Sequence, residues 1–291
     1  MVKCALCSSV STPWRVIDGY QLWDCQGCGH RFTCADSAAS HVAATYSDDY
    51  FFGGGAGYPD YLAESSLLTK RGAWYAELVS KHGEPGSVLE LGAAAGFTLQ
   101  AFRDAGWSAV GLEPNATMAE YGREELGLDL RTGSLEECEV EDPFDLVLLL
   151  QVVAHLVDPK GDLERAASLV RPGGYFLVET WDRSSPVARA LGARWHEYSP
   201  PSVLHWFSRD SLDALFQELG CEPVAGGRPK KRISGAHLKS LLRHASGRSM
   251  FNRALRAASA PVPDGLCLPY PSWDLFWRLY RKVNLPAAEE R

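Results

Sequence analysis

Short apolar runs alternate with helical patterns through the middle of the chain, between about residues 87 and 221. Apolar strands are predicted at 87–91, 109–112, 145–151 and 175–180, with a weaker one near 128–131. Helices are predicted between and after them at 97–105, 116–126, 162–170 and 208–219, most of them ended by a glycine. The run 145–151 is continuously apolar, which is typical of a strand buried on both faces. This alternation predicts an α/β fold with a parallel sheet.

The pattern changes on both sides of this region. Residues 46–61 are rich in aromatic residues and glycine, and residues 62–81 carry an apolar stripe at helical spacing. The segment 82–86, which contains glycine and proline, then ends the helical pattern. Toward the other end, residues 237–258 predict one or two basic helices, whereas 272–283 fits a strand as well as a helix.

Composition and charge are those of an ordinary globular protein. The chain is 46% hydrophobic and 22% charged, and its net charge of -7 argues against a nucleic-acid coat, because phosphate binding needs a basic surface. It has no run of 18 apolar residues and no apolar secretory signal, so we expect no membrane span and a cytoplasmic location. In that compartment the eight cysteines are not expected to form disulfides.

Five of the eight cysteines lie within the first 34 residues, which indicates a separate unit. Cys4 and Cys7 form one CxxC pair, Cys25 and Cys28 form another, and 17 residues separate the pairs. Each pair can place two thiolates on one side of a tight turn, and two turns complete a tetrahedron around Zn²⁺. Redox-active pairs or buried thiols would not account for this spacing. Four thiolates leave no position for water, so the predicted zinc is structural.

Two other residues are alternatives for the fourth zinc ligand, His30 and Cys34. The symmetrical spacing of the two CxxC pairs favours the four cysteines over both. Gly27 and Gly29 suit the second turn, because glycine permits a positive φ close to the metal.

The first predicted strand leads into a run of small residues that opens a helix. Glu90 closes this strand, and Gly92-Ala93-Ala94-Ala95-Gly96-Phe97 follows, so a ligand can approach the backbone closely. Glu113 ends the second strand, where its carboxylate could accept both hydroxyls of a ribose. The run lacks the Gly-x-Gly-x-x-Gly pattern of dinucleotide sites, and the acidic Glu90 suits a cationic ligand better than an anionic one.

The motifs in the α/β region together resemble class I S-adenosylmethionine-dependent methyltransferases. The segments that carry the resemblance, in the expected order, are 89–96 (LELGAAAG, motif I), 110–114 (VGLEP, the ribose-binding strand), 133–136 (GSLE, the loop flanking the adenine), 144–147 with 155–159 (FDLV and HLVDP, motif IV and its continuation) and 171–175 (RPGGY, the turn before the fifth strand). They cover about residues 87–221. The resemblance implies a Rossmann-like sheet of about seven mostly parallel strands.

Segments outside that core are similar to a branch of the family that carries a zinc ribbon and methylates sugars, polysaccharides and natural products. These segments are the CxxC pairs, the aromatic pair at 50–51 and Pro-Ser-Val-Leu-His-Trp-Phe-Ser at 201–208. Two departures stand out. Ala94 occupies a position that is usually glycine, and alanine is small enough for binding to survive. Ala154 precedes His155 where many members have glutamate, so no role can be transferred to an acid there.

The resemblance and the residue patterns divide the chain into four parts. We predict a zinc ribbon at 1–36, a helical and aromatic lid at 37–85, the S-adenosylmethionine-binding Rossmann-like domain at 86–228, and a helical insertion with a final strand at 229–291. The expected cofactor-binding residues are Tyr50, Glu90, Gly92, Ala93, Gly96, Phe97, Glu113, Pro114, Ser134, Leu135 and Gln151.

The lid and the end of the third long strand each leave an alternative open. Tyr50, with Tyr46 and Phe51, could close over the sulfonium through cation–π contacts, or simply pack an N-terminal helix on the sheet. Gln151 could contact the methionine moiety or the substrate, or cap its strand.

Three histidines are candidates for the base that takes a proton from the acceptor. His155 follows a buried strand on the substrate side, and its alternative role is that of a capping or core residue. His205 lies in the segment that resembles the family's substrate-side loop, although a structural role beside two aromatic residues is the alternative. His196, between Trp195 and Glu197, is a weaker candidate.

These residues predict a methyltransferase that acts on a small-molecule acceptor such as a sugar, a nucleotide sugar or a natural-product intermediate. O-methylation with a histidine base is expected first, and C-methylation of an activated carbon is an alternative. A non-catalytic scaffold with a degenerate cofactor site is a second alternative, against which Glu90, Gly92, Gly96 and Glu113 argue. The basic residues at 228–256 could bind a phosphorylated or carrier-bound substrate, or form a solvated helix face. The sequence predicts no nucleic-acid or membrane partner.

Overall fold

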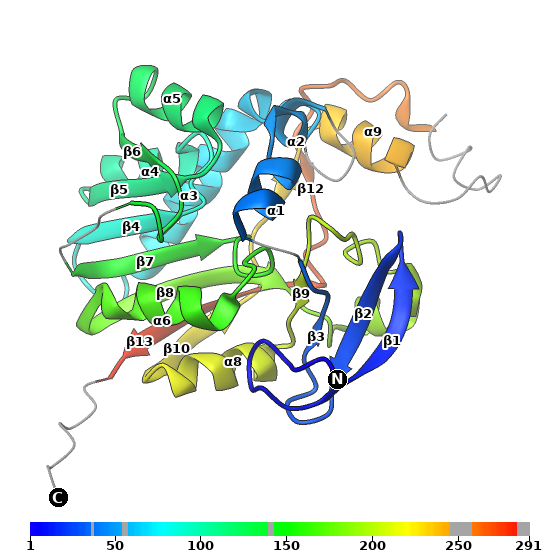
Figure 1. Ribbon diagram of the computed structural model, residues 1–291. Helices are drawn as coiled ribbons and strands as arrows, with labels where there is room; N and C mark the ends of the chain where they lie inside the picture. Colours follow the sequence, from blue (N-terminus) through cyan, green and yellow to red (C-terminus); the bar gives the residue numbers. More distant parts are fainter. Residues whose placement is uncertain (36–37, 54–57, 139–142, 245–257, 284–291) are drawn as a thin grey trace, which may run out of the picture.

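Figure 1 shows the computed structural model, which describes residues 1–35, 38–53, 58–138, 143–244 and 258–283. Its main sheet has seven strands in the order β10-β13-β8-β7-β4-β5-β6. The strands are β4 (Ser87–Leu91), β5 (Ser108–Glu113), β6 (Asp129–Thr132), β7 (Phe144–Leu150), β8 (Val170–Trp181), β10 (Cys221–Gly227) and β13 (Leu275–Lys282). Strands β8, β7, β4, β5 and β6 are parallel, and β13 runs antiparallel to both β8 and β10. The predicted seven-stranded, mostly parallel sheet is confirmed.

Helices cover both faces of this sheet, because successive side chains of a strand point to opposite faces. The helices of the domain are α3 (Ser65–Val79), α4 (Phe97–Asp104), α5 (Ala116–Glu124), α6 (Pro159–Ser168) and α8 (Arg209–Glu218). On β7, Leu146 and Leu148 belong to a buried cluster with residues of α3 and α4, whereas Val147 and Leu149 belong to a cluster with residues of α6 and α8. The run is continuously apolar in the sequence because β7 packs against helices on both faces of the sheet.

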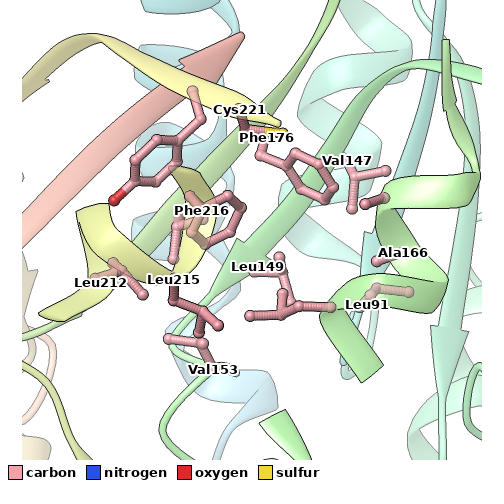
Figure 2. Packing of buried hydrophobic residues seen from close by; sticks show 14 of the residues in the cluster. Leu91, Val147, Leu149, Val153, Ala166, Phe176, Leu212, Leu215, Phe216 and Cys221 are labelled. Atoms are coloured by element: carbon pink, nitrogen blue, oxygen red, sulfur yellow. The ribbon is translucent and has the colours of Figure 1, made fainter. Parts of the chain in front are cut away.

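The second of these clusters is drawn in Figure 2, where Phe176 of β8 lies against Phe216 of α8. Their ring centroids are 5.2 Å apart, and Phe216 also stacks on Tyr280 of β13 at 4.1 Å. Burial of each such side chain contributes roughly 1.5–3 kcal/mol. This packing fixes β7, β8 and β13 relative to one another and so aligns the ends of these strands.

Side-chain caps fix where the helices begin. Asn115 accepts a hydrogen bond from the N–H of Met118 at the start of α5, and Asp158 does the same for Gly161 in α6. Ser208, the first residue of the predicted helix at 208–219, caps α8 in a capping box with Ser211. These caps set the loops at the carboxyl ends of the strands that precede α5 and α6.

The N-terminal unit is a small antiparallel sheet that continues into the larger domain. It contains β1 (Ser11–Ile17), β2 (Tyr20–Cys25) and β3 (Arg31–Phe32), and its fourth strand is β9 (His205–Trp206) from the other end of the domain. The guanidinium of Arg31 bonds both carboxylate oxygens of Asp24 at 2.7 Å and the hydroxyl of Tyr198 at 2.7 Å. The ribbon is therefore joined to the α/β domain by backbone pairing and by a buried cation.

A set of short helices lies beside the carboxyl ends of the central strands, as the arrowhead of β7 and the position of α1 show in Figure 1. The set comprises α1 (Ala38–Thr45), α2 (Asp48–Phe52) and η1 (Leu62–Glu64), and η1 runs into α3. Two further short helices, α7 (Pro186–Leu191) and η2 (Gly192–Arg194), follow β8.

The structure resolves one open prediction and corrects another. Residues 272–283, which fitted either element, contain β13, because this strand completes the sheet between β8 and β10. Strand β8 begins at Val170 and includes the Arg-Pro-Gly-Gly run that was expected to be a turn, since Val170 pairs with Phe144.

The segment between β10 and β13 contains β11 (Arg232–Ile233), α9 (Gly235–His244) and β12 (Leu268–Pro269). Arg248, Arg253 and Arg256, which belong to the predicted basic helices, lie outside the described residues. Within the described ranges, none of the helices is both long and apolar enough to cross a membrane.

Candidate functional site

The loop between β4 and α4 brings backbone, rather than side chains, to the carboxyl edge of the sheet. Gly92 and Gly96 have φ angles of 65° and 83°, in the left-handed region that favours glycine. A Cβ at Gly92 would lie 2.7 Å from Val152, and one at Gly96 would lie 2.5 Å from Leu128. Ala93 is buried beside them. The loop is therefore fixed in a glycine-dependent conformation at the carboxyl end of β4, and its role in binding a ligand stays a prediction.

Ala94 shares this conformation without being a glycine. Its φ is 48°, and its side chain is buried in a cluster with Phe51, Phe97 and Met118. A left-handed backbone costs an L-residue about 1–2 kcal/mol. The departure from the usual glycine is thus accommodated by packing of the methyl group.

Glu113 is held at the end of β5 by two backbone donors. Its Oε2 accepts from the N–H of Ala94 and its Oε1 from the N–H of Asn115, each at 2.8 Å. Burial raises the pKa of the carboxyl, and the two hydrogen bonds oppose that effect. Each oxygen keeps a second lone pair, so the carboxylate can still accept two hydroxyl protons.

Glu90, on the neighbouring strand, is buried and lacks one partner. No donor among the described residues reaches its Oε2. Burial, followed by the nearby charge of Glu113, raises the pKa of Glu90 to about 8. A buried carboxyl without a partner favours a cationic ligand, which would supply the missing donor and stabilise the ionised form.

Aromatic side chains of the N-terminal helices cover this edge. The ring of Tyr50 lies 5.2 Å from that of Tyr46 and 5.3 Å from that of Phe51. The ring of Tyr61 stacks on Phe97 at 5.9 Å. Tyr50 is also close enough to Glu113 for that charge to contribute to raising its pKa, after burial as the first cause. The predicted cofactor residues Tyr50 and Phe97 thus belong to one aromatic cover.

A cavity of about 310 Å³ opens between this cover and α5. Its lining is Val42, Tyr46, Ser47, Asp48, Pro114, Asn115, Ala116 and Thr117. The Asn115 side chain donates to the carbonyl of Tyr46 and to a carboxylate oxygen of Asp48, both at 3.0 Å, and so ties the two walls together. The cavity lies next to Glu113, with Pro114 in its wall.

The predicted adenine loop follows β6. The N–H of Gly133 donates to the carbonyl of Glu113 at 2.9 Å, and the N–H of Ser134 donates to Glu137. Leu135 packs against the sheet. Gly133 therefore ties the start of this loop, which continues into Ser134 and Leu135, to the end of β5.

Gln151 faces a neighbour on the next strand. Its φ is 63°, and its amide donates to Glu179 Oε1 at 2.6 Å. Arg71 and Tyr75, both on α3, also donate to the Glu179 carboxylate. These contacts engage the Gln151 amide with the side chain of Glu179, and its contact with the cofactor stays a prediction.

This Glu179 network was missed in the sequence. Glu179 is fully buried at the carboxyl end of β8, two residues before Trp181. A charged residue inside an otherwise apolar strand was the available signal, because such a residue is buried only with a partner. Its partner Arg71 is more than a hundred residues away, so spacing could not connect the two.

The three candidate histidines lie in different surroundings. The Nδ1 of His155 contacts the carbonyl of Ser202, and since a carbonyl can only accept, Nδ1 carries the proton. Burial lowers the pKa of His155 and keeps the ring neutral. Its ring meets that of Tyr46 edge-on at 5.7 Å. His155 is thus oriented, with Nε2 unprotonated, beside the aromatic cover.

His205 lies in the joint between the ribbon and the domain. It is 2% exposed, and its Nδ1 lies 3.0 Å from the Nε2 of His30. Burial lowers its pKa to about 3. In contrast, His196 has a partly exposed side chain that donates to Glu197 at 2.9 Å. Burial acts to lower its pKa, but the hydrogen bond and charge of Glu197 help to outweigh this, so the pKa is raised.

The four predicted zinc ligands converge. All four sulfur atoms of Cys4, Cys7, Cys25 and Cys28 lie within 4.8 Å of one another, with Cys7 and Cys25 at 3.4 Å and Cys4 and Cys28 at 3.7 Å. Zinc–sulfur bonds of about 2.3 Å in a tetrahedron require sulfur atoms about 3.8 Å apart. The donor set therefore fits Zn²⁺.

The alternatives for the fourth ligand are separate from this cluster. His30 points to His205, and the cluster of described metal-binding groups does not include Cys34. Gly29 has the expected positive φ of 67°, whereas Gly27 does not. Gly27 is needed for space, because a Cβ there would lie 2.4 Å from Ser9.

Comparison with known proteins gives a family match over the same region. Residues 67–225 match the model of a family described as a methyltransferase domain. Over 129 residues the chain is 33% identical to a ubiquinone biosynthesis O-methyltransferase of Bradyrhizobium sp. (strain ORS 278), covering 42% of this chain and 48% of that protein. A ubiquinone biosynthesis O-methyltransferase of Rhodopseudomonas palustris (strain BisB5) is 28% identical over 144 residues, covering 46% and 57%. The chain thus spans about half the length of these curated relatives.

A solved structure extends the likeness in fold. The 1,6-didemethyltoxoflavin-N1-methyltransferase of Burkholderia thailandensis, solved with bound 1,6-didemethyltoxoflavin and S-adenosylhomocysteine, aligns with a TM-score of 0.52. The alignment covers 94% of this chain and 99% of that one at 16% identity. This identity supports the shared fold only.

Proposed function

The chain belongs to the methyltransferase domain family, and we propose that it transfers a methyl group from S-adenosylmethionine to a small-molecule acceptor. The observation that carries this proposal is the pair of buried carboxyls at the ends of β4 and β5, Glu90 and Glu113. One has an oxygen without a partner, and the other is held by two backbone donors with lone pairs to spare. S-adenosylmethionine carries both an ammonium group, which needs an acceptor such as Glu90, and ribose hydroxyls, which need an acceptor such as Glu113.

The residues at this edge fit S-adenosylmethionine one group at a time. Glu113 would accept the ribose hydroxyls, Glu90 would receive the ammonium group, and the loop after β6 would flank the adenine. When bound, the cofactor supplies an electrophilic methyl group on a sulfonium. The aromatic cover would exclude water and stabilise the positive charge.

His155 is the base that we propose for an oxygen acceptor. Its Nδ1 proton is held by the carbonyl of Ser202, which leaves Nε2 free to take the hydroxyl proton. His205 suits this role less, because its pKa is about 3 and one of its nitrogens is engaged by His30. The His196–Glu197 pair is a second candidate, since a carboxylate partner increases the basicity of an imidazole.

For the acceptor, we propose a hydroxyl group on a sugar, a nucleotide sugar or a natural-product intermediate. The relatives named ubiquinone biosynthesis O-methyltransferases support oxygen as the accepting atom. C-methylation remains the alternative, and it would require an acidic C–H bond beside a carbonyl. In either case the chain's task is to align the acceptor and remove its proton.

The proposed cofactor is tested by titrating the purified protein with S-adenosylmethionine and S-adenosylhomocysteine in a calorimeter. We expect micromolar binding, and Glu113→Ala should weaken it by about 10- to 100-fold, the loss typical of hydrogen bonds to a charged group. Glu120→Ala, an exposed glutamate on α5, is the matched control and should bind normally. Absence of binding to the wild type would reject the enzyme and favour the scaffold alternative.

We also propose that Cys4, Cys7, Cys25 and Cys28 hold one structural zinc ion. The support is the convergence of four thiolates at tetrahedral spacing. Elemental analysis should find one zinc per chain, and Cys25→Ser should reduce the zinc content, whereas Cys34→Ser should not. Zinc retained in full by Cys25→Ser would contradict the assignment.

A further inference from the structure

Lys231 lies at the carboxyl end of the sheet beyond the cofactor residues. Its ammonium nitrogen is 5.1 Å from the ring centroid of Trp181 and 4.9 Å from that of Tyr270. Trp181 is the last residue of β8 and pairs with Leu275, the first of β13. Lys231 therefore sits over the ends of β8 and β13, on the same edge as Glu90 and Glu113.

The ammonium has aromatic neighbours but lacks an oxygen partner. Across the five described ranges, no oxygen atom forms a hydrogen bond or an ion pair with it. Burial lowers its pKa, and the positive charge of Arg71 adds to that effect. Three N–H donors of a partly buried ammonium are thus left for something outside this set of residues.

The nearby carboxylates do not fill this gap, because each has a partner of its own. Glu179 is bonded by Arg71, Tyr75 and Gln151. Glu197 is paired with His196, and Asp274 accepts from the indole N–H of Trp195 at 2.8 Å.

Other lysines of the chain differ from Lys231 in this respect. Lys160 and Lys239 each pair with a carboxylate, and Lys282 donates to two backbone carbonyls. The adjacent Lys230 is exposed, with its ammonium 5.9 Å from the ring centroid of Trp74. Within the basic run 228–232, Lys231 is thus the residue turned toward the strand ends, and Arg232 instead bonds Cys267.

We propose that Lys231 binds an anionic oxygen group, a carboxylate or a phosphate, on the acceptor molecule. This inference rests on the proposed function, because it assigns the cofactor to the ends of β4 and β5 and the acceptor to the ends of β7, β8 and β13. The flat faces of Trp181 and Tyr270 beside the ammonium would flank the same ligand. Lys231 is a substrate-specificity residue in this assignment, and it has no part in the proton transfer.

The experiment follows NMR shifts of backbone and indole N–H groups in the zinc-loaded protein with S-adenosylhomocysteine present. Inorganic phosphate and benzoate are titrated separately at constant ionic strength, so the two arms distinguish a phosphate site from a carboxylate site. We expect millimolar binding of at least one probe, with the largest shift at the Trp181 indole. Lys231→Met should weaken it at least about tenfold, whereas Lys230→Met, the matched control, should bind like the wild type.

A second variant guards against loss of structure. Lys231→Arg keeps the charge and should retain binding within a few-fold, which a general folding defect would not allow. Two results would overturn the inference: no binding of either probe to the wild type, or equal affinity in Lys231→Met. Calorimetry with S-adenosylhomocysteine on the same samples tests the proposed function separately. Binding of S-adenosylhomocysteine without binding of either probe overturns only the role of Lys231. The probe titrations are also repeated without S-adenosylhomocysteine, so that probe binding does not depend on the cofactor site.

Discussion

The two halves of the carboxyl edge of the sheet are built in different ways. One half, at the ends of β4, β5 and β6, is the proposed cofactor half. Its two carboxyls and loop lie close together in the chain, since Glu90, the 92–96 loop and Glu113 fall within 24 positions. The other half, at the ends of β7, β8 and β13, is the proposed acceptor half, and it combines Arg71, Glu179 and Lys231 from distant segments. A site built from residues close together in the chain can be recognised as a sequence motif. A site assembled from distant segments cannot.

The halves also differ in how their charges are satisfied. In the cofactor half two carboxyls lie near each other, and one of them lacks a partner, which prepares the site for a cation. In the acceptor half the carboxylates are paired, and an ammonium is left over. One part of the edge thus has a carboxyl without a donor, and the adjacent part has an ammonium without an acceptor. This difference favours a positively charged ligand group at the first part and a negatively charged one at the second.

The largest effect should come from breaking the acceptor half at Arg71. Arg71→Met leaves the Glu179 carboxylate buried without its guanidinium, which should cost about 3–5 kcal/mol of unfolding free energy. Urea unfolding measures this loss. Arg71→Met combined with Glu179→Gln should recover most of it, because the buried group is then neutral. A loss below about 1 kcal/mol in the single variant would show that the pair does not hold this half together.

A second prediction concerns pH and the cofactor half. The pKa of Glu90 is about 8, so this carboxyl is mostly protonated at pH 6 and becomes ionised as the pH rises. Because the ionised form attracts an ammonium group, affinity for S-adenosylhomocysteine should rise between pH 6 and 8, by up to about tenfold per unit, and then level off. Calorimetry across this range measures it.

Glu90→Gln provides the control for this pH dependence. The amide does not titrate, so the rise should disappear while the fold is retained. The same slope in the wild type and in Glu90→Gln would assign the pH dependence to another group.

The smallest effect should come from the backbone of the 92–96 loop. Ala94→Gly relieves a left-handed φ of 48° but removes a buried methyl group and adds chain entropy, so stability should change by less than about 1 kcal/mol. Ala95→Gly is the matched control, because Ala95 is fully buried without a positive φ. It should lose about 1 kcal/mol more than Ala94→Gly in thermal unfolding. Equal losses would show that Ala94 is unstrained.

Much of the fold was predictable because it rests on local rules. The apolar run at 145–151, the glycines after the helices and the helix predicted at 208–219 each express a short-range preference, and the structure confirms them. The ambiguity at 272–283 was of another kind. Its residues form a strand because they pair with β8 on one side and with β10 on the other. The residues of the segment alone do not specify these partners.

The same distinction applies to the site. The cysteine pairs could be grouped from spacing, since a tight turn holds each pair. The roles of His205 and Gln151 could not be resolved, because they depend on His30 and Glu179, which come from other parts of the chain. Lys231 was visible only as part of a basic run, and its environment needed Trp181 and Tyr270.

The sequence by itself determined the family, the parallel strands of the sheet, the small-residue loop after β4 and the cysteine pairs of this protein. These features depend on backbone conformation and on contacts between neighbours, which a short stretch of residues encodes. Only the tertiary structure decided which histidine is oriented, which carboxylates are paired and which ammonium is left over. Those properties arise from desolvation and from long-range contacts, and both exist only once distant segments have packed together.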